Sequence, residues 1–132
     1  TNIHRYNILV NPDYRFEEQN DRLKMINKDK NKYVISNNED IMEAVVGIDH
    51  YIAHPLNTTG KTAMIDITVP PVTDDLLIDG LKRIMNNYLQ NGIYYFKTDA
   101  DNINTKVLLD LGFKNESGAV RWSSIRDVHR SR

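Results

Sequence analysis

The sequence feature that most constrains the fold is a helix pattern between two extended runs, within residues 63–96. Residues 63–69 have the sequence AMIDITV and end at two prolines, and residues 93–96 have the sequence IYYF. Between these runs, apolar residues recur at helical spacing, which predicts one amphipathic helix over residues 73–91. A strand, a helix and a strand form a right-handed crossover, so the two strands should lie parallel. The apolar stripe of this helix consists of Leu77, Leu81, Ile84, Met85 and Tyr88.

A second, shorter helix is predicted after the aromatic run. Asn102 and the aspartates just before it can each accept a backbone N–H at a helix start. Apolar residues follow at helical spacing until Gly112, which stands where helices often end in a left-handed conformation. Phe113 then begins another extended run, and the sequence predicts a last hairpin around residues 116–118.

The first quarter of the chain predicts a strand followed by a helix. Residues 3–10 end in Ile-Leu-Val, which is typical of a buried strand. Asn11 is a suitable helix cap, and Pro12 suits the first helical position, where no N–H is needed. We therefore expect a helix over residues 12–28, with a solvated turn at the charged residues 28–32.

The period then changes from helical to extended, which predicts an antiparallel meander. Residues 33–36 and 41–53 form two extended runs about an Asn-rich turn, and residues 63–69 supply the third strand. Gly47 falls within the second run and predicts a bulge or a close approach there. The whole order predicts an α/β (α+β) fold: a mixed sheet with an antiparallel meander, a following βαβ unit and a C-terminal hairpin.

Composition sets limits on size and partners. The chain has 132 residues, 40% of them hydrophobic, so we expect residues 1–132 to form one domain, by itself or within a longer chain. Its 17 Lys and Arg against 18 Asp and Glu give no reason to expect a nucleic-acid or membrane partner. The absence of cysteine excludes disulfides and is compatible with a cytoplasmic location. No apolar run approaches the length of about 20 residues that spans a bilayer, so we expect a soluble protein.

Three short motifs, taken in order, indicate a family. They are EAVVG at residues 43–47, ITVP at residues 67–70 and NTKVLLDLGF at residues 104–113. With this order of elements the chain resembles the GNAT superfamily of acyl-CoA-dependent N-acyltransferases over about residues 33–123. The last motif is similar to the Ser-x-Arg-Val-Leu-Glu-Lys-Leu-Gly-Phe helix of the branch that acetylates ribosomal-protein N-termini and related amines.

The resemblance implies a cofactor site. In that family, the strands that would end near Val69 and Phe96 splay apart, and the pantetheine arm of acetyl-CoA lies between them. The acceptor would be an amine-bearing small molecule or a protein N-terminus. The positions that the resemblance assigns to the cofactor are Ile67, Thr68, Val69, Thr73, Asn102 and Asn104.

Direct acyl transfer also needs a group that removes a proton from the amine. Asp66 lies on the strand that should splay and Glu43 on its neighbour, so these two carboxylates are the candidate proton acceptors. The alternative for each is a solvated or ion-paired strand carboxylate. We expect no metal site, because His50 and His54 would lie about 13 Å apart along a strand.

The chain departs from the family pattern at the loop that would hold the cofactor's phosphates. The family's Arg/Gln-x-x-Gly-x-Gly/Ala loop is replaced here by Pro71-Val-Thr-Asp-Asp75, and two carboxylates there would repel a pyrophosphate. Two hypotheses therefore remain open: an N-acyltransferase, or a catalytically inactive GNAT-like module for ligand sensing or protein interaction. The region before residue 33 has room for one helix where the family usually has two. The acceptor site would therefore be unusually open, or another domain or subunit would complete it.

Overall fold

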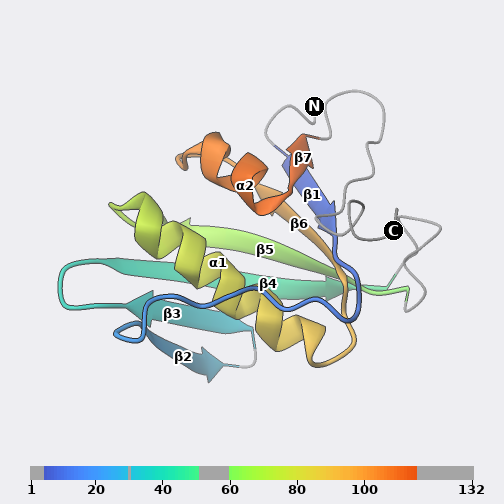
Figure 1. Ribbon diagram of the computed structural model, residues 1–132, viewed down its shortest axis with the longest axis horizontal. Coiled ribbons are helices and arrows are strands. Elements are labelled where there is room, and N and C mark those ends of the chain that lie inside the picture. The colour runs from blue at the N-terminus through green and yellow to red at the C-terminus, as the bar shows by residue number, and fades with distance from the viewer. Residues whose placement is uncertain (1–4, 30, 51–59, 116–132) are drawn as a thin grey trace.

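The computed structural model describes residues 5–29, 31–50 and 60–115 as an α+β fold (Figure 1). One mixed sheet has the strand order β2-β3-β4-β5-β6-β1-β7, and all neighbouring pairs are antiparallel except β5 and β6. The elements in this part of the chain are β1 (Arg5–Leu9), β2 (Lys24–Asp29), β3 (Lys32–Ser36), β4 (Ile41–Asp49), β5 (Thr62–Val69), α1 (Asp74–Leu89), β6 (Tyr95–Asp99), α2 (Thr105–Leu111) and β7 (Lys114–Asn115).

The predicted crossover unit is confirmed. Helix α1 joins β5 to β6, and these two strands pair in parallel. The strand begins two residues later than predicted because Gly92, at φ 84°, and the turn around it separate the helix from β6. All residues of the predicted apolar stripe of α1 are buried, each 8% exposed or less. This stripe covers one face of the sheet and packs against buried side chains of the strands to form the core.

The predicted meander is also confirmed, as β3, β4 and β5. The irregular position, however, is not Gly47, so the bulge predicted there is wrong. Gly47 stands opposite Met64 in regular register, whereas the register shifts between Glu43 and Ala44. Thr68 is the extra residue on β5 at this bulge, since Ile67 and Val69 face Ala44 and Glu43.

The helix predicted over residues 12–28 is absent, and that prediction is wrong. Residues 10–23, which we call the strap, have no helix or strand, and β2 occupies residues 24–29. Phe16 and Leu23 of the strap are buried as the apolar pattern suggested, at 4% and 6% exposure. The backbone of the strap bonds partly within two short turns, from Tyr14 N–H to Asn11 O and from Leu23 N–H to Asn20 O. Side chains of α1 also bond the backbone of Phe16 and Asn20, so no continuous helix is needed.

The strap exists because β1 lies far from β2. β1 is inserted between β6 and β7, and four strands separate it from β2. At about 4.8 Å per strand, the chain must travel roughly 24 Å across the sheet. Figure 1 shows the strap crossing α1 from the β1 side to the opposite edge. The contact between β1 and β6 joins segments about 90 residues apart, which no local pattern indicates.

The shorter helix α2 has the predicted end but a different start. Gly112 has φ 107° and closes the helix, as predicted. The N-cap is Asn104, whose Oδ1 accepts from Lys106 N–H, and not Asn102, which is left-handed at φ 64°. Beyond β7, the predicted final hairpin lies outside the described residues.

Candidate functional site

The site expected from the sequence lies where β5 and β6 part. The two strands pair from Thr62 with Tyr95 to Ile65 with Thr98. β5 then continues to Val69, still paired with β4 on its other side. Within the described residues, the β6 side of residues 66–69 therefore has no strand partner. We call this region the wedge.

A small hollow marks the wedge. Its volume of about 80 Å³ is only two to three times the roughly 30 Å³ that one water occupies in the liquid. It has room for a small group such as an acetyl, and a whole cofactor would have to extend outside it. The hollow is lined by Arg5, Met64, Ile65, Asp66, Lys97, Thr98 and Asp99.

Charged side chains of both signs line the wedge, namely Arg5, Asp66, Lys97 and Asp99. Arg5 and Asp99 form an exposed ion pair, with 3.6 Å between Nε and Oδ1. Asp66 lies on the sheet face turned away from α1, because Ile65 before it belongs to the core and side chains alternate along a strand. Asp66 is exposed and accessible to solvent. Its carboxylate can accept a proton from a ligand bound in the hollow.

Glu43, the second proposed proton acceptor, lies on the same face. It alternates with the buried residues Met42 and Ala44, and it is half-buried. Its Oε1 lies 3.3 Å from Lys32 Nζ, so this carboxylate already has an ion-pair partner. Glu43 is thus an ion-paired strand carboxylate, which is the alternative to a proton acceptor given above. Asp66 is the more accessible of the two carboxylates.

Three predicted cofactor residues gather at the same end of β5. Val69 faces Glu43 across the strands, and the Thr68 hydroxyl donates to the Glu43 carbonyl at 3.3 Å. Ile67 points into the core, against which it packs while partly buried. Ile67, Thr68 and Val69 therefore lie near both carboxylates, on two neighbouring strands.

Thr73 is the fourth predicted cofactor residue, and it is held in place by a residue that the sequence analysis did not identify. Asp40, in the turn between β3 and β4, lies against the start of α1 and is 9% exposed. Its Oδ2 accepts from Thr73 N–H at 2.9 Å and from the Thr73 hydroxyl at 2.8 Å, and its Oδ1 accepts from Val72 N–H at 2.9 Å. Asp40 therefore occupies donors that an anion at this helix start would need.

These contacts also set the protonation of Asp40. Burial disfavours its charged form, but the hydrogen bonds from Val72, Thr73 and Ile41 outweigh burial and lower the pKa of Asp40 below its usual value. The carboxylate is consequently charged at neutral pH and holds the loop before α1 in place.

The remaining two predicted cofactor residues lie on the loop before α2. Asn104 caps α2, and its Nδ2 donates to Asp74 Oδ2 at 3.0 Å. It therefore links the start of α2 to the first turn of α1. Asn102 is exposed, and its left-handed conformation turns the chain into the loop.

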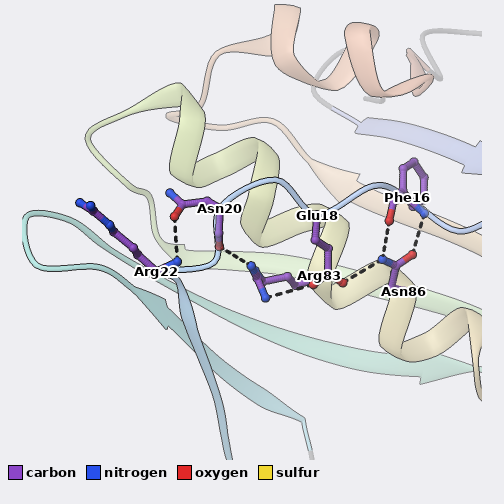
Figure 2. Close-up of polar contacts among 6 residues, drawn as sticks. All are labelled: Phe16, Glu18, Asn20, Arg22, Arg83 and Asn86. Carbon is purple, nitrogen blue, oxygen red and sulfur yellow. Dashed lines mark hydrogen bonds and ion pairs between the residues drawn. The ribbon is translucent and has the colours of Figure 1, made fainter.

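The strap is fixed to α1 by polar contacts that Figure 2 shows. Asn86 Oδ1 accepts from Phe16 N–H at 2.8 Å, while Asn86 Nδ2 donates to Phe16 O at 2.9 Å. Arg83 donates to Asn20 O at 2.5 Å and pairs with Glu18, with 3.0 Å between Nη1 and Oε1. The side chain of Asn86 thus bonds the strap as a neighbouring strand would.

The sequence carried a signal for this second face of α1. Asp79, Arg83 and Asn86 follow at helical spacing beside the apolar stripe, and Asp79 and Asn86 are buried. A polar stripe of this kind indicates a polar partner, although the pattern alone does not say which segment provides it.

Two absences hold for the described part of the chain. No group of three or more His, Asp or Glu side chains there could hold a metal ion. None of its helices is both long enough and apolar enough to span a membrane.

Comparisons with models of protein families, with curated proteins and with solved structures give no match for this chain.

Proposed function

We propose that this chain is a GNAT-like domain that transfers an acetyl group from acetyl-CoA to a primary amine. The observation that carries the proposal is the wedge, where β5 runs past its last β6 partner to Val69. Backbone N–H and C=O groups of a strand require hydrogen-bond partners. The two amides of a pantetheine arm can provide these partners, as an added strand would. The parting of the central strands supports the expectation drawn from the family resemblance.

The chemistry proposed for the wedge is direct transfer. The amine nitrogen attacks the thioester carbon, the carbon–sulfur bond breaks, and CoA leaves as the thiol after taking up a proton. Asp66, which lines the hollow and is accessible, accepts the proton that the amine loses. A backbone N–H near Val69 stabilises the oxyanion. The acceptor is an amine-bearing small molecule or a protein N-terminus.

A second candidate function rests on Asp40. Its carboxylate bonds the N–H groups of Val72 and Thr73, so the start of α1 is already occupied by a negative group. The first turn adds Asp74 and Asp75, which repel phosphate. These contacts favour a catalytically inactive GNAT-like module that senses a ligand or binds a protein.

Calorimetric titration with acetyl-CoA, desulfo-CoA and free pantetheine distinguishes the two. Micromolar binding of acetyl-CoA, about −8 kcal/mol, together with weaker but measurable binding of pantetheine, supports the transferase. Amine acetylation by the same sample, followed as release of the CoA thiol, completes that test. Absence of acetyl-CoA and pantetheine binding at millimolar concentration rules out the transferase for this chain and leaves the second candidate.

A variant separates the phosphate contribution from that of pantetheine. Asp40→Asn removes the negative charge at the start of α1, so the transferase hypothesis expects tighter binding of acetyl-CoA and no change for pantetheine. Glu39→Gln, which alters an exposed neighbouring carboxylate, is the matched control. Equal affinities in all three proteins would contradict the placement of the phosphates beside α1.

A further inference from the structure

Asp79 is a buried carboxylate that neither proposed function uses. It lies in α1 and is 7% exposed. Across residues 5–29, 31–50 and 60–115, no hydrogen bond or ion pair to its side chain is present. Buried carboxylates are ordinarily paired, because loss of water around a charge costs free energy. A nearly buried carboxylate without a partner therefore indicates that its partner is a ligand.

The nearest cationic side chains on α1 do not fill this role. Arg83 follows one turn after Asp79, but its guanidinium is directed to the strap, where it bonds Glu18 and Asn20 (Figure 2). Lys82 makes no ion pair with Asp79 within the described residues, and it lines the neighbouring hollow. Within the described residues, Asp79 thus has no cationic side chain in direct contact with its carboxylate.

The carboxylate of Asp79 faces a hollow between α1 and the strap. The hollow has a volume of about 320 Å³ and is lined by Gln19, Asn20, Asp75, Ile78 and Asp79. Asp75 stands one turn before Asp79 on the same face of the helix, so two carboxylates border the hollow. Asp75 alone has an ordinary role, because acidic residues in a first turn favour the helix dipole. Asp79 lies beyond the first turn, and that role does not account for it.

A second hollow adjoins the first and is more apolar. It has a volume of about 400 Å³ and shares Gln19 and Ile78 with the acidic hollow. Its further lining residues are Tyr14, Phe16, Glu17, Lys82, Asp110 and Leu111. We call the two adjoining hollows together the strap groove. The carboxylates of Asp75 and Asp79 border its first part, and its second part combines aromatic and aliphatic side chains with the charged Glu17, Lys82 and Asp110.

We propose that the strap groove binds an organic cation, an amine or guanidine that carries an apolar group. The cationic head pairs with Asp79 and Asp75, and the apolar body lies against Ile78 and Phe16. Bringing a cation to a buried, unpaired carboxylate relieves the cost of its burial, which gives this ligand class an advantage over a neutral one. The strap groove is separate from the wedge, so this proposal does not depend on acetyl-CoA.

The test uses the whole chain and three small probes of similar shape. Phenethylamine carries a cation and a ring, 2-phenylethanol replaces the amine by a hydroxyl, and 3-phenylpropionate carries an anion. Titrations followed by ¹H–¹⁵N NMR give the affinities and locate the perturbed amides. We expect phenethylamine to bind with shifts in residues 14–20 and 75–82, about tenfold or more tightly than 2-phenylethanol, and 3-phenylpropionate not to bind.

Variants assign the binding to the carboxylates. Asp79→Asn is expected to weaken phenethylamine binding by about tenfold or more and to raise or preserve the melting temperature, since it removes an unpaired buried charge. Asp75→Asn should weaken binding by a smaller factor, and Asp13→Asn, on the strap outside the groove, should leave binding unchanged. If phenethylamine does not bind, binds no better than 2-phenylethanol, or binds Asp79→Asn as well as the wild type, the proposal is overturned.

Discussion

Asp40 and Thr73 are joined by two hydrogen bonds to the same carboxylate oxygen, from the Thr73 N–H at 2.9 Å and from its hydroxyl at 2.8 Å. The two residues lie 33 positions apart, at the β3–β4 turn and at the cap of α1. Thr73 in turn accepts from Leu76 N–H at 3.3 Å. The start of α1 is therefore held to the sheet by a chain of hydrogen bonds that begins at one carboxylate.

This relationship predicts that stability depends on Asp40. Replacing it by alanine leaves the N–H groups of Val72 and Thr73 without their acceptor, and hydrogen bonds to a charged group contribute about 1.5–3 kcal/mol each in protein interiors. We expect Asp40→Ala to lower the free energy of unfolding by about 2–3 kcal/mol, measured by urea denaturation at about pH 7. Glu39→Ala is the control, and a loss no larger than the control's would contradict this role.

The same carboxylate predicts a pH dependence with a definite sign. The folded-state pKa of Asp40 lies below its unfolded value of about 3.9, so its contribution is complete above that value. It is lost as pH falls through the lower, folded pKa. The difference in unfolding free energy between the wild type and Asp40→Asn should therefore be constant above about pH 5 and shrink towards zero in more acidic solution. A difference that grows on acidification would show the opposite sign.

The contact between Asn86 and Phe16 makes a third prediction, about the strap. Asn86→Ala removes the partners of the Phe16 N–H and C=O, both in a buried setting, so we expect a loss of about 2–3 kcal/mol in the free energy of unfolding. Amide exchange of Phe16 should also become faster than in the wild type, whereas that of β4 should change only through global stability. Gln90→Ala, at an exposed position after α1, is the control. Unchanged exchange at Phe16 would mean that the strap is held by other contacts.

Local periodicity predicted the parts of the fold that are themselves local. The stripe from Leu77 to Tyr88 and the left-handed Gly112 follow from the neighbouring sequence, and both are confirmed. The strap was mistaken for a helix because its partners, Arg83 and Asn86, stand more than 60 residues away. The insertion of β1 next to β6 is equally non-local, so a sequence pattern could not indicate it.

The candidate site was predictable to a similar degree. Asp66 and Val69 follow from their place at the end of a strand, which both the motif and the meander indicate. Asp40 and Asp79 were missed, because Asp40 belongs to a turn and Asp79 stands outside the apolar stripe of α1. Their importance comes from what the tertiary fold sets against them, namely the start of α1 and the strap.

Close packing between α1 and the sheet makes a fourth prediction. A Cβ added to Gly80 would lie 2.7 Å from Met42 Sδ and 3.2 Å from Ile35 Cδ1, and both side chains are fully buried. Alanine gains about 1 kcal/mol in helix propensity, but overpacking costs about 1–3 kcal/mol, so we expect Gly80→Ala to lower stability by up to about 2 kcal/mol. Gly47→Ala is the matched control, because a Cβ there meets nothing within 4 Å. If Gly80→Ala is more stable than the wild type, Met42 has room to move.

The proposed transfer chemistry makes the last prediction, which concerns Asp66 and Glu43. Asp66 is accessible at the wedge, whereas Glu43 is ion-paired with Lys32. If Asp66 accepts the proton of the amine, Asp66→Asn should lower kcat for acetyl transfer by about 10²-fold or more and leave KM for acetyl-CoA nearly unchanged. Raising the pH should restore part of the rate, since more of the amine is then already deprotonated.

Glu43→Gln should change stability more than kcat. The substitution breaks an ion pair, but it does not remove the group that accepts the proton of the amine. Asp49→Asn, an exposed carboxylate on β4, is the control, and equal kcat losses for Asp66→Asn and Asp49→Asn would remove Asp66 from the mechanism.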